Sequence, residues 1–168
     1  MDCVYLVPLP DFRTVQYVEG VMDPYIYKAV VKRVIDGDSV VLDIDCGFDI
    51  VLQDQSTRLY GVDTPETRMV EGGNTHLKVL GQLAKERVQA LLPTGKEVHV
   101  RSHLDKRGKF GRILVEVFLS WGEECSLNQI LIDQRYGVAY EGQSKQEILL
   151  KHLANVEHWR NTGRLEEE

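Results

Sequence analysis

The sequence predicts an α+β fold, in which five strands form a small barrel and about three helices pack around it. Runs of β-branched residues bounded by turn residues fill positions 25–62 and return at 97–101 and 112–118. Between these two groups, apolar residues recur at spacings of three and four, the period of an amphipathic helix. A chain of 168 residues with 43% hydrophobic and 27% charged residues has the size and composition of one globular domain. Closing the strands into a five-stranded OB-fold β-barrel would remove exposed sheet edges, so we expect this architecture.

The first three strands are predicted to form an antiparallel meander. Residues 25–35 and 39–44 are two β-rich runs joined by Asp36-Gly37, and an Asp-Gly step between such runs strongly favours a hairpin. A third strand is predicted over residues 48–62, with a bulge or bend at the polar residues 53–56. Since the three runs follow one another closely, consecutive pairing is expected.

Three helices are predicted from their caps and their apolar spacing. Asn74 can cap the first helix, which ends before Pro93 and buries a face made of Leu77, Leu80, Ala84, Val88 and Leu91. A Ser-x-x-Gln capping pattern at Ser126 begins a short helix that ends near Gln134. The last helix is predicted over residues 145–159, and it is expected to bury Leu149, Leu153 and Val156.

We expect one domain over residues 23–165, preceded by an N-terminal extension over 1–22 that has no sustained period. The chain has 20 Lys and Arg against 26 Asp and Glu, a net charge of -6. Broad attraction to nucleic acid or acidic lipid is therefore not expected, and any anion must be held locally. No apolar run reaches the roughly 18 residues of a membrane span, and the first residues lack the positive region of a signal peptide. We expect a monomer without membrane association, located in the cytoplasm or encoded by a virus and intracellular.

Two carboxylates flank a glycine in the turn between the first two strands. Asp36 and Asp38 can be turn residues, because aspartate readily forms hydrogen bonds with its own backbone. The same turn lies at the end of a rigid strand and can present both carboxylates to a ligand. The segment alone leaves both interpretations open.

A second charged segment follows Arg58. An arginine on a half-buried strand needs an anion or a paired carboxylate, because its donors are costly to desolvate unpaired. Pro65 holds Thr64 extended with its carbonyl outward, and the bend brings Asp63 and Glu66 toward the same side. Such oxygen ligands suit Ca2+ or Mg2+ rather than zinc. The alternative is a capped turn with a structural ion pair between Arg58 and an acidic residue.

These segments closely resemble the staphylococcal-nuclease-like (thermonuclease) family. The resemblance is carried by Val-Ile-Asp-Gly-Asp-Ser-Val at residues 34–40, Arg-Leu-Tyr-Gly-Val-Asp-Thr-Pro-Glu-Thr at 58–67 and Lys-Phe-Gly-Arg at 109–112. Matching motifs run in the same order from about Tyr27 to Trp159, which is most of the chain. The resemblance implies an OB-fold phosphodiesterase that uses Ca2+ to hydrolyse DNA and RNA, leaving 5'-hydroxyl and 3'-phosphate ends.

The resemblance also implies a role for each matching residue. Asp38 and Asp63 would bind Ca2+ directly together with the backbone carbonyl of Thr64, and Asp36 would lie just behind these ligands. Glu66 would orient or deprotonate the attacking water, while Arg58 and Arg112 would hold the scissile phosphate. Tyr140 would contact a terminal phosphate, and the remaining substrate contacts would come from Lys109 and Phe110.

Three departures from the family pattern affect substrate choice. Gly142 stands where a second tyrosine is common, and Phe110 stands where a tyrosine is common. The loop at residues 69–74 is short and acidic, where the best-known members have a lysine-rich loop. We therefore expect a preference for single strands, whose bases can stack on Phe110. The alternatives are a catalytically inactive OB-fold module that binds nucleic acid or protein, and a compact domain whose Asp and Arg residues form only ion pairs.

Overall fold

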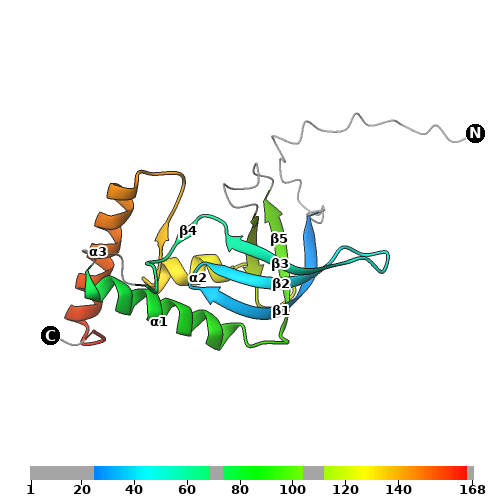
Figure 1. Ribbon diagram of the computed structural model, residues 1–168, viewed down its shortest axis with the longest axis horizontal. Helices are drawn as coiled ribbons and strands as arrows, with labels where there is room; N and C mark the ends of the chain where they lie inside the picture. The colour runs from blue at the N-terminus through cyan, green and yellow to red at the C-terminus, as the bar shows by residue number, and fades with distance from the viewer. Residues whose placement is uncertain (1–24, 69–73, 104–111, 166–168) are drawn as a thin grey trace, which may run out of the picture.

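The computed structural model describes residues 25–68, 74–103 and 112–165, and within them five strands form a closed barrel. The barrel strands, in their order around the barrel, are β1 (Ile26–Asp36), β2 (Ser39–Asp45), β3 (Val51–Leu59), β6 (Ile113–Phe118) and β5 (Glu97–His103). Strands β1, β2 and β3 pair consecutively and antiparallel, so the predicted meander is confirmed. The parallel pairing of β3 with β6 closes the barrel, and this pairing requires the long connection between the two strands that Figure 1 shows. The predicted α+β barrel is confirmed.

The third strand differs from its prediction at both ends. It begins at Val51 because Phe48 and Asp49, with φ of 54° and 60°, form the turn of the β2–β3 hairpin. The expected bulge is present: Asp54 has φ of 51°, and the register with β2 shifts there by one residue. Beyond Leu59 the chain leaves the barrel, so the predicted continuation to residue 62 is wrong.

A separate two-stranded sheet begins where the third strand was expected to continue. Strand β4 (Val62–Asp63) pairs antiparallel with β7 (Val138–Ala139). The sequence did not predict this sheet, because two residues are too few to show the alternation of a strand. The pairing joins the segment after β3 to the C-terminal part of the chain.

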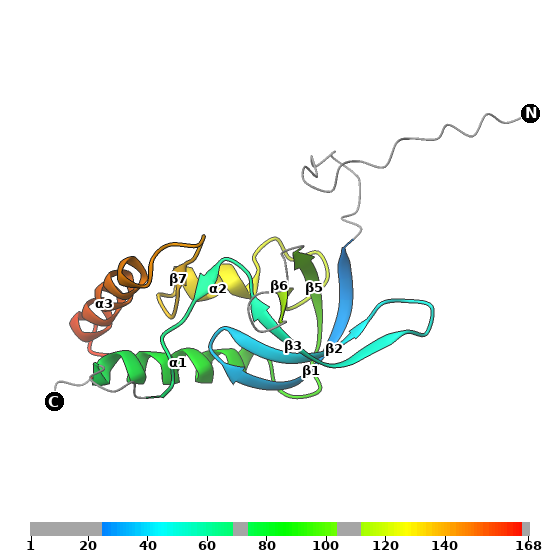
Figure 2. The same cartoon turned by 45° about the horizontal axis from the view of Figure 1, so that its top comes forward.

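The first two helices begin at their predicted caps, and the third begins at its predicted first residue, Lys145. Helix α1 (Thr75–Leu91) is capped by Asn74, α2 (Leu127–Asp133) by Ser126, and α3 (Lys145–Asn161) by a capping box between Ser144 and Glu147. Helix α1 runs beside the barrel, and α3 packs at the end of α1 that lies away from the β2–β3 hairpin (Figures 1 and 2). Among the described helices, none is long and apolar enough to cross a membrane.

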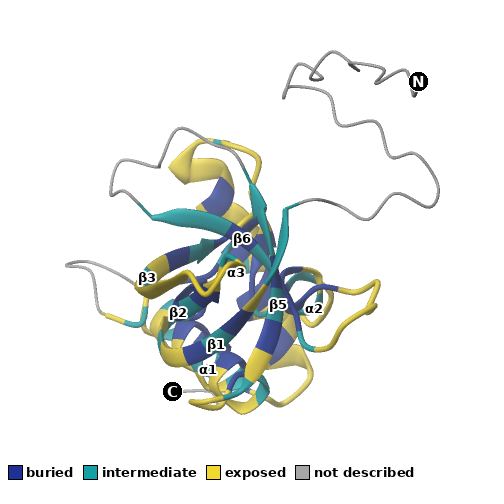
Figure 3. Cartoon of the chain, turned by 90° about the vertical axis from the view of Figure 1, so that its right-hand side faces the viewer, coloured by how far each residue is buried: buried dark blue, intermediate teal, exposed yellow. Residues whose placement is uncertain are grey.

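The hydrophobic core fills the barrel and continues under α1 and α2. Figure 3 shows the buried residues gathered inside the barrel, and fully buried members include Val31, Leu42, Leu59, Val100, Val115, Val88 and Leu131. A smaller cluster joins α1 to α3 through Leu80, Val156 and Trp159. The predicted face of α3 is partly wrong, because Leu149 is 45% exposed. The buried side of α3 is instead formed by Ile148, His152, Asn155, Val156 and Trp159.

Candidate active site

The turn between β1 and β2 is packed tightly against the segment that follows β4. A Cβ atom on Gly37 would lie 2.7 Å from the Thr64 hydroxyl oxygen and 3.0 Å from the Ala84 Cβ, so this close approach requires glycine. The carboxylate of Asp36 accepts a hydrogen bond of 3.1 Å from the Gly37 N–H, within its own turn. Packing of the turn therefore brings Asp38, the residue after Gly37, next to Thr64.

Arg58 joins the two predicted metal-binding carboxylates. Its Nη2 atom lies 3.0 Å from Asp38 Oδ2 and 2.7 Å from Asp63 Oδ1. Strand pairing sets this geometry, because Arg58 on β3 lies opposite Ser39 on β2 and Leu59 N–H donates to the Asp38 carbonyl. The side chain of Asp38 is only 8% exposed, whereas those of Arg58 and Asp63 are 22% and 25% exposed. A half-buried Arg58 was predicted to need an anion or a paired carboxylate, and the structure provides two carboxylates, Asp38 and Asp63.

The two carboxylates of this cluster have pKa values shifted in opposite directions. Burial raises the pKa of Asp38, although the Arg58 charge and the Ser39 hydroxyl favour its charged form. Partial burial would also raise the pKa of Asp63, but the His152 hydrogen bond and the Arg58 charge outweigh burial and lower it. Asp63 is therefore the more firmly ionised member of the pair.

Arg112 reaches the same cluster through a hydroxyl group. Its Nη1 atom donates to Ser39 Oγ at 3.1 Å, and Ser39 Oγ donates to Asp38 Oδ1 at 2.9 Å. Arg112 immediately precedes β6, and Arg58 lies near the end of β3, the strand that pairs with β6. The structure thus brings both predicted arginines to one carboxylate.

The Thr64–Glu66 segment is held between the barrel and α1. The Thr64 N–H faces Asp38 Oδ2 at 3.5 Å, and Thr64 is 6% exposed. A Cβ atom on Gly81 of α1 would lie 2.7 Å from the Glu66 carbonyl oxygen, so the helix backbone lies directly behind this segment. The Glu66 side chain is exposed. The backbone of Glu66 is thus held against α1, while its side chain extends into solvent.

His152 is a member of the cluster that the sequence analysis missed. Its Nε2 atom lies 3.0 Å from Asp63 Oδ2, and the residue is only 5% exposed. Both oxygens of Asp63 are therefore engaged, one by Arg58 and the other by His152. A sequence signal existed: His152 falls in a stripe of buried positions on α3 that includes Ile148, Val156 and Trp159. A polar residue in an otherwise apolar stripe needs a buried partner.

The structure describes only some of the remaining predicted site residues. Tyr140 is 39% exposed, and its N–H donates to the Gly61 carbonyl at 2.9 Å, next to the strand that carries Asp63. Lys109, Phe110 and most of the acidic loop, residues 69–73, lie outside the described residues, as does the N-terminal extension. Their predicted roles stay predictions.

The oxygen atoms of the cluster fit a hard divalent cation. Carboxylate oxygens of Asp38 and Asp63 converge on Arg58 Nη2, so a cation bound by both carboxylates would share these oxygens with Arg58. An oxygen set of this kind suits Ca2+ better than zinc. Within the described parts of the chain, no three His, Cys, Asp or Glu side chains gather as a metal-binding group. Any cation here would need backbone or solvent oxygens in addition to these two carboxylates.

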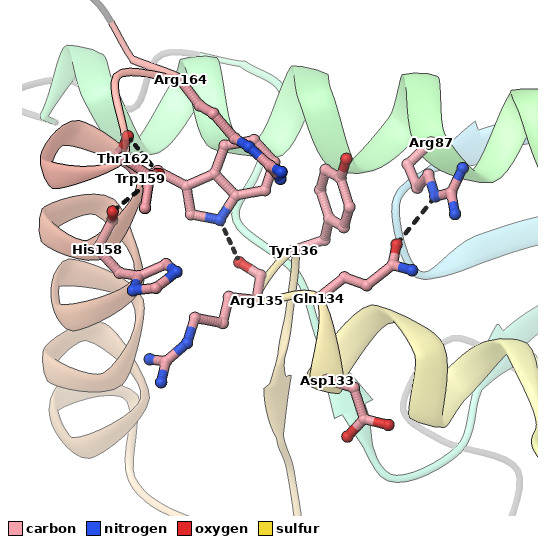
Figure 4. Close-up of a pocket in the computed structure, with 9 residues that line it drawn as sticks. All are labelled: Arg87, Asp133, Gln134, Arg135, Tyr136, His158, Trp159, Thr162 and Arg164. Atoms are coloured by element: carbon pink, nitrogen blue, oxygen red, sulfur yellow. Dashed lines mark hydrogen bonds between the residues drawn. The ribbon is translucent and has the colours of Figure 1, made fainter.

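A pocket of about 480 Å³ lies elsewhere, where α1, α3 and the turn after α2 meet (Figure 4). Its polar lining includes Arg87, Arg135, Arg164 and Asp133. The Trp159 indole N–H donates to the Arg135 carbonyl at 3.2 Å, so the wall of the pocket is also a packing contact. No residue of the Asp38–Arg58–Asp63 cluster lines this pocket.

A closed five-stranded barrel with three packed helices defines an OB-fold protein, and this one has two arginines and two carboxylates clustered beside its barrel. The profile of the family described as Staphylococcal nuclease homologue matches residues 56–163. The chain belongs to this family.

Two curated relatives are named thermonuclease. The protein from Staphylococcus intermedius is 38% identical over 90 residues, which cover 54% of this chain and 48% of the relative. The protein from Staphylococcus hyicus is 33% identical over 140 residues, which cover 80% of this chain and 76% of the relative. The matched region is thus about half of the first relative and about three quarters of the second.

Proposed function

We propose that this protein is a Ca2+-dependent nuclease that hydrolyses DNA, RNA or both to fragments with 5'-hydroxyl and 3'-phosphate ends. The observation that carries the proposal is the position of Arg58 Nη2, 3.0 Å from Asp38 and 2.7 Å from Asp63, with Arg112 linked to Asp38 through Ser39. Two guanidinium groups and two carboxylates at one point can hold both a phosphate and a cation. The names of the two relatives support this assignment.

The two arginines are assigned to the scissile phosphate. Attack on a phosphodiester places growing negative charge on the phosphoryl oxygens, and donors already fixed there stabilise the transition state more than the substrate. Arginine suits this role because its planar group donates two parallel hydrogen bonds to phosphate oxygens. The contacts of Arg58 and Arg112 within the cluster hold both groups in place before a substrate arrives.

Glu66 is assigned to the attacking water. Its side chain extends into solvent from a backbone segment fixed against α1, so it can accept a proton from a water molecule near the phosphate. The oxygen of that water bonds to phosphorus while the bond from phosphorus to the 5'-oxygen breaks. The 5'-oxygen then takes a proton from solvent, which leaves a 5'-hydroxyl on one fragment and a 3'-phosphate on the other.

Asp38, Asp63 and the Thr64 carbonyl are assigned to Ca2+. The bound ion would supply positive charge that offsets the repulsion between the phosphodiester and the carboxylates. His152 and Arg58 hold the two oxygens of Asp63, so this carboxylate has a fixed orientation. We assign His152 a positioning role through Asp63.

Single strands are proposed as the preferred form of the substrate. A net charge of -6 and an acidic loop at residues 69–74 disfavour binding of long duplexes, which present a high density of phosphate charge. Initial rates on a single strand and on the matched duplex, in moderate salt, test this preference. Equal rates on the two would contradict it.

The end groups of the products test the proposed function. A single-stranded oligonucleotide is incubated with the protein and Ca2+, and the fragments are treated with polynucleotide kinase or with phosphatase. We expect 5' ends that accept a phosphate directly and 3' ends that lose one to phosphatase. The Glu66→Gln variant, with unchanged circular dichroism, serves as the control for a contaminating nuclease. Binding without cleavage would instead favour the inactive OB-fold module.

A further inference from the structure

An exposed pair of stacked rings lies just beyond Arg58. The rings of Tyr60 and His103 are nearly parallel, with an interplanar angle of 8° and centroids 3.9 Å apart. Tyr60 is 46% exposed although His103 covers one face of its ring. A large aromatic side chain with this much exposure is available to a ligand that has a flat ring of its own.

The His103 side of the pair is fixed by charged neighbours. His103 Nε2 lies 3.0 Å from Glu116 Oε2, and Arg101 Nη1 lies 3.1 Å from the same oxygen. These three residues lie on the neighbouring strands β5 and β6, where Arg101 is paired with Glu116. The imidazole ring is thus held in one orientation under Tyr60, and the Glu116 carboxylate is balanced by a cation.

The backbone of Tyr60 is fixed as well. Its N–H donates to the Val115 carbonyl at 2.8 Å, and its own carbonyl accepts a hydrogen bond of 2.8 Å from the Asn128 side-chain amide. Asn128 is 4% exposed and belongs to α2. A ring on a fixed backbone loses little conformational entropy when a ligand stacks on it.

The position of Tyr60 relates the ring pair to the cluster. Arg58 and Tyr60 flank Leu59, which is 1% exposed and points into the barrel. Tyr60 follows directly on β3, two residues after Arg58, so the Cα atoms of the two residues are at most about 7 Å apart. Tyr140 is joined to the residue after Tyr60, since its N–H donates to the carbonyl of Gly61. A nucleotide with its phosphate at Arg58 would have Tyr60 within reach of a neighbouring base.

We propose that the Tyr60–His103 pair is a subsite on which a base of a single-stranded substrate stacks while Arg58 holds an adjacent phosphate. The inference rests on the proposed function and deepens it, because it names the part of the substrate that this surface binds. Stacking on an aromatic ring is tolerant of base identity, since every base has a π face. The subsite therefore selects unpaired bases rather than a sequence, because bases within a duplex are already stacked on each other.

Binding in the absence of turnover tests the subsite. Fluorescence anisotropy is measured in EGTA with two labelled single strands of equal length, one with bases and one entirely abasic, so that both have the same phosphates. We expect the wild-type protein to bind the strand with bases more tightly, and Tyr60→Ala to weaken that binding about 10-fold, the scale of one lost base stack. Binding of the abasic strand should change less than about 2-fold, because phosphate contacts remain.

Two matched variants separate stacking from folding. Tyr60→Phe keeps the ring and should bind the strand with bases like the wild type, whereas Tyr60→Leu keeps apolar bulk and should bind it like Tyr60→Ala. Equal losses on both strands, or no loss on either, would overturn the subsite. Since these assays need no cleavage, a protein that stacks bases but never hydrolyses them would overturn the proposed function and leave the subsite standing.

Discussion

Two regions of the molecule concentrate arginine side chains, and they differ in the partners that surround these side chains. In the cluster at the barrel surface, Arg58 contacts the carboxylates of Asp38 and Asp63. In the pocket between the helices, Arg87 donates to the Gln134 side chain, and Arg164 lies over the Trp159 ring at 5.2 Å. Within the described part of the chain, neither of these pocket arginines forms an ion pair with a carboxylate.

The difference shows that a pocket does not mark the proposed site in this protein. The pocket is lined mostly by exposed residues, and its arginines connect α1, the turn after α2 and α3, and so support helix packing. The cluster lies where two barrel strands and the Thr64–Glu66 segment meet, and both Arg58 and Asp63 are partly exposed there. A polymer needs such an open surface, because a strand of nucleic acid continues beyond the site in both directions. The arginines of the two regions should therefore respond very differently to substitution.

The largest effect is expected from Arg58→Lys and Arg112→Lys. Each variant should fold but lose at least about 100-fold in kcat, the scale of one lost transition-state donor. Lysine keeps the charge but loses the two-pronged geometry, so kcat should fall more than KM rises. The measurement is steady-state kinetics on a short single-stranded oligonucleotide, with circular dichroism as the folding control. A folded variant that retains more than about a third of the wild-type kcat would show that its arginine is structural.

A smaller effect is expected from His152→Ala. Loss of the 3.0 Å contact leaves Asp63 Oδ2 without its buried partner, so the apparent affinity for Ca2+ should fall about 10-fold. His152→Gln can donate an amide N–H to the same oxygen and should recover part of the loss. The affinity is read from the rise in unfolding temperature as Ca2+ is added, which requires no turnover. Unchanged Ca2+ affinity in a folded His152→Ala variant would remove the positioning role.

Glu116→Gln should have an effect on stability that depends on pH. The His103 hydrogen bond and the Arg101 charge outweigh partial burial and lower the pKa of Glu116 in the folded protein. A carboxylate whose pKa is lower in the folded protein adds stability at pH values above its unfolded-state pKa of about 4.3. This stabilisation is lost as the pH falls through the folded-state pKa. At pH 7 the variant should be less stable by about 1 kcal/mol, the scale of one charged hydrogen bond. Urea unfolding should show that the difference in free energy of unfolding between the wild type and the variant becomes smaller in acid. A difference that does not change with pH would contradict this explanation.

The smallest effect is expected from Arg135→Lys in the pocket. Arg135 contacts Trp159 through its backbone carbonyl, and this contact does not depend on the side chain. We expect kcat and KM within about 2-fold of the wild type, as for a surface substitution away from the site. This variant is the matched control for Arg58→Lys, because both exchange arginine for lysine. A loss as large as that of Arg58→Lys would remove the distinction between the two regions.

Local motifs of the sequence predicted much of the barrel and of the cluster. The Asp-Gly step fixed the β1–β2 hairpin because turn chemistry depends on neighbouring residues alone. The need of a half-buried arginine for an anion or a carboxylate predicted a partner for Arg58, and the structure identifies Asp38 and Asp63 as its partners. The resemblance to the staphylococcal-nuclease-like family then related these residues to Arg112, far away in the sequence.

Contacts between residues far apart in the sequence could not be predicted from local motifs. His152 meets Asp63 across 89 residues, and no local pattern relates a helix face to the two-residue strand β4. Leu149 is 45% exposed although Val156, seven residues further along the same face of α3, is buried, so its exposure depends on which elements pack against the N-terminal part of the helix. The stacking of Tyr60 on His103 likewise depends on the parallel pairing of β3 with β6, which closes the barrel.

The proposed function requires Asp38, Asp63 and Arg58 to form a Ca2+-dependent site for phosphodiester hydrolysis. Its most direct test is the initial rate on single-stranded DNA as free Ca2+ is buffered from chelated to saturating levels with EGTA, with Asp38→Asn measured in parallel. We expect no cleavage in EGTA, a saturable rise in rate with Ca2+, little turnover with Mg2+ in its place, and little activity of the folded variant at any Ca2+ concentration. Full activity of the wild-type protein in EGTA, with no divalent ion present, would contradict it.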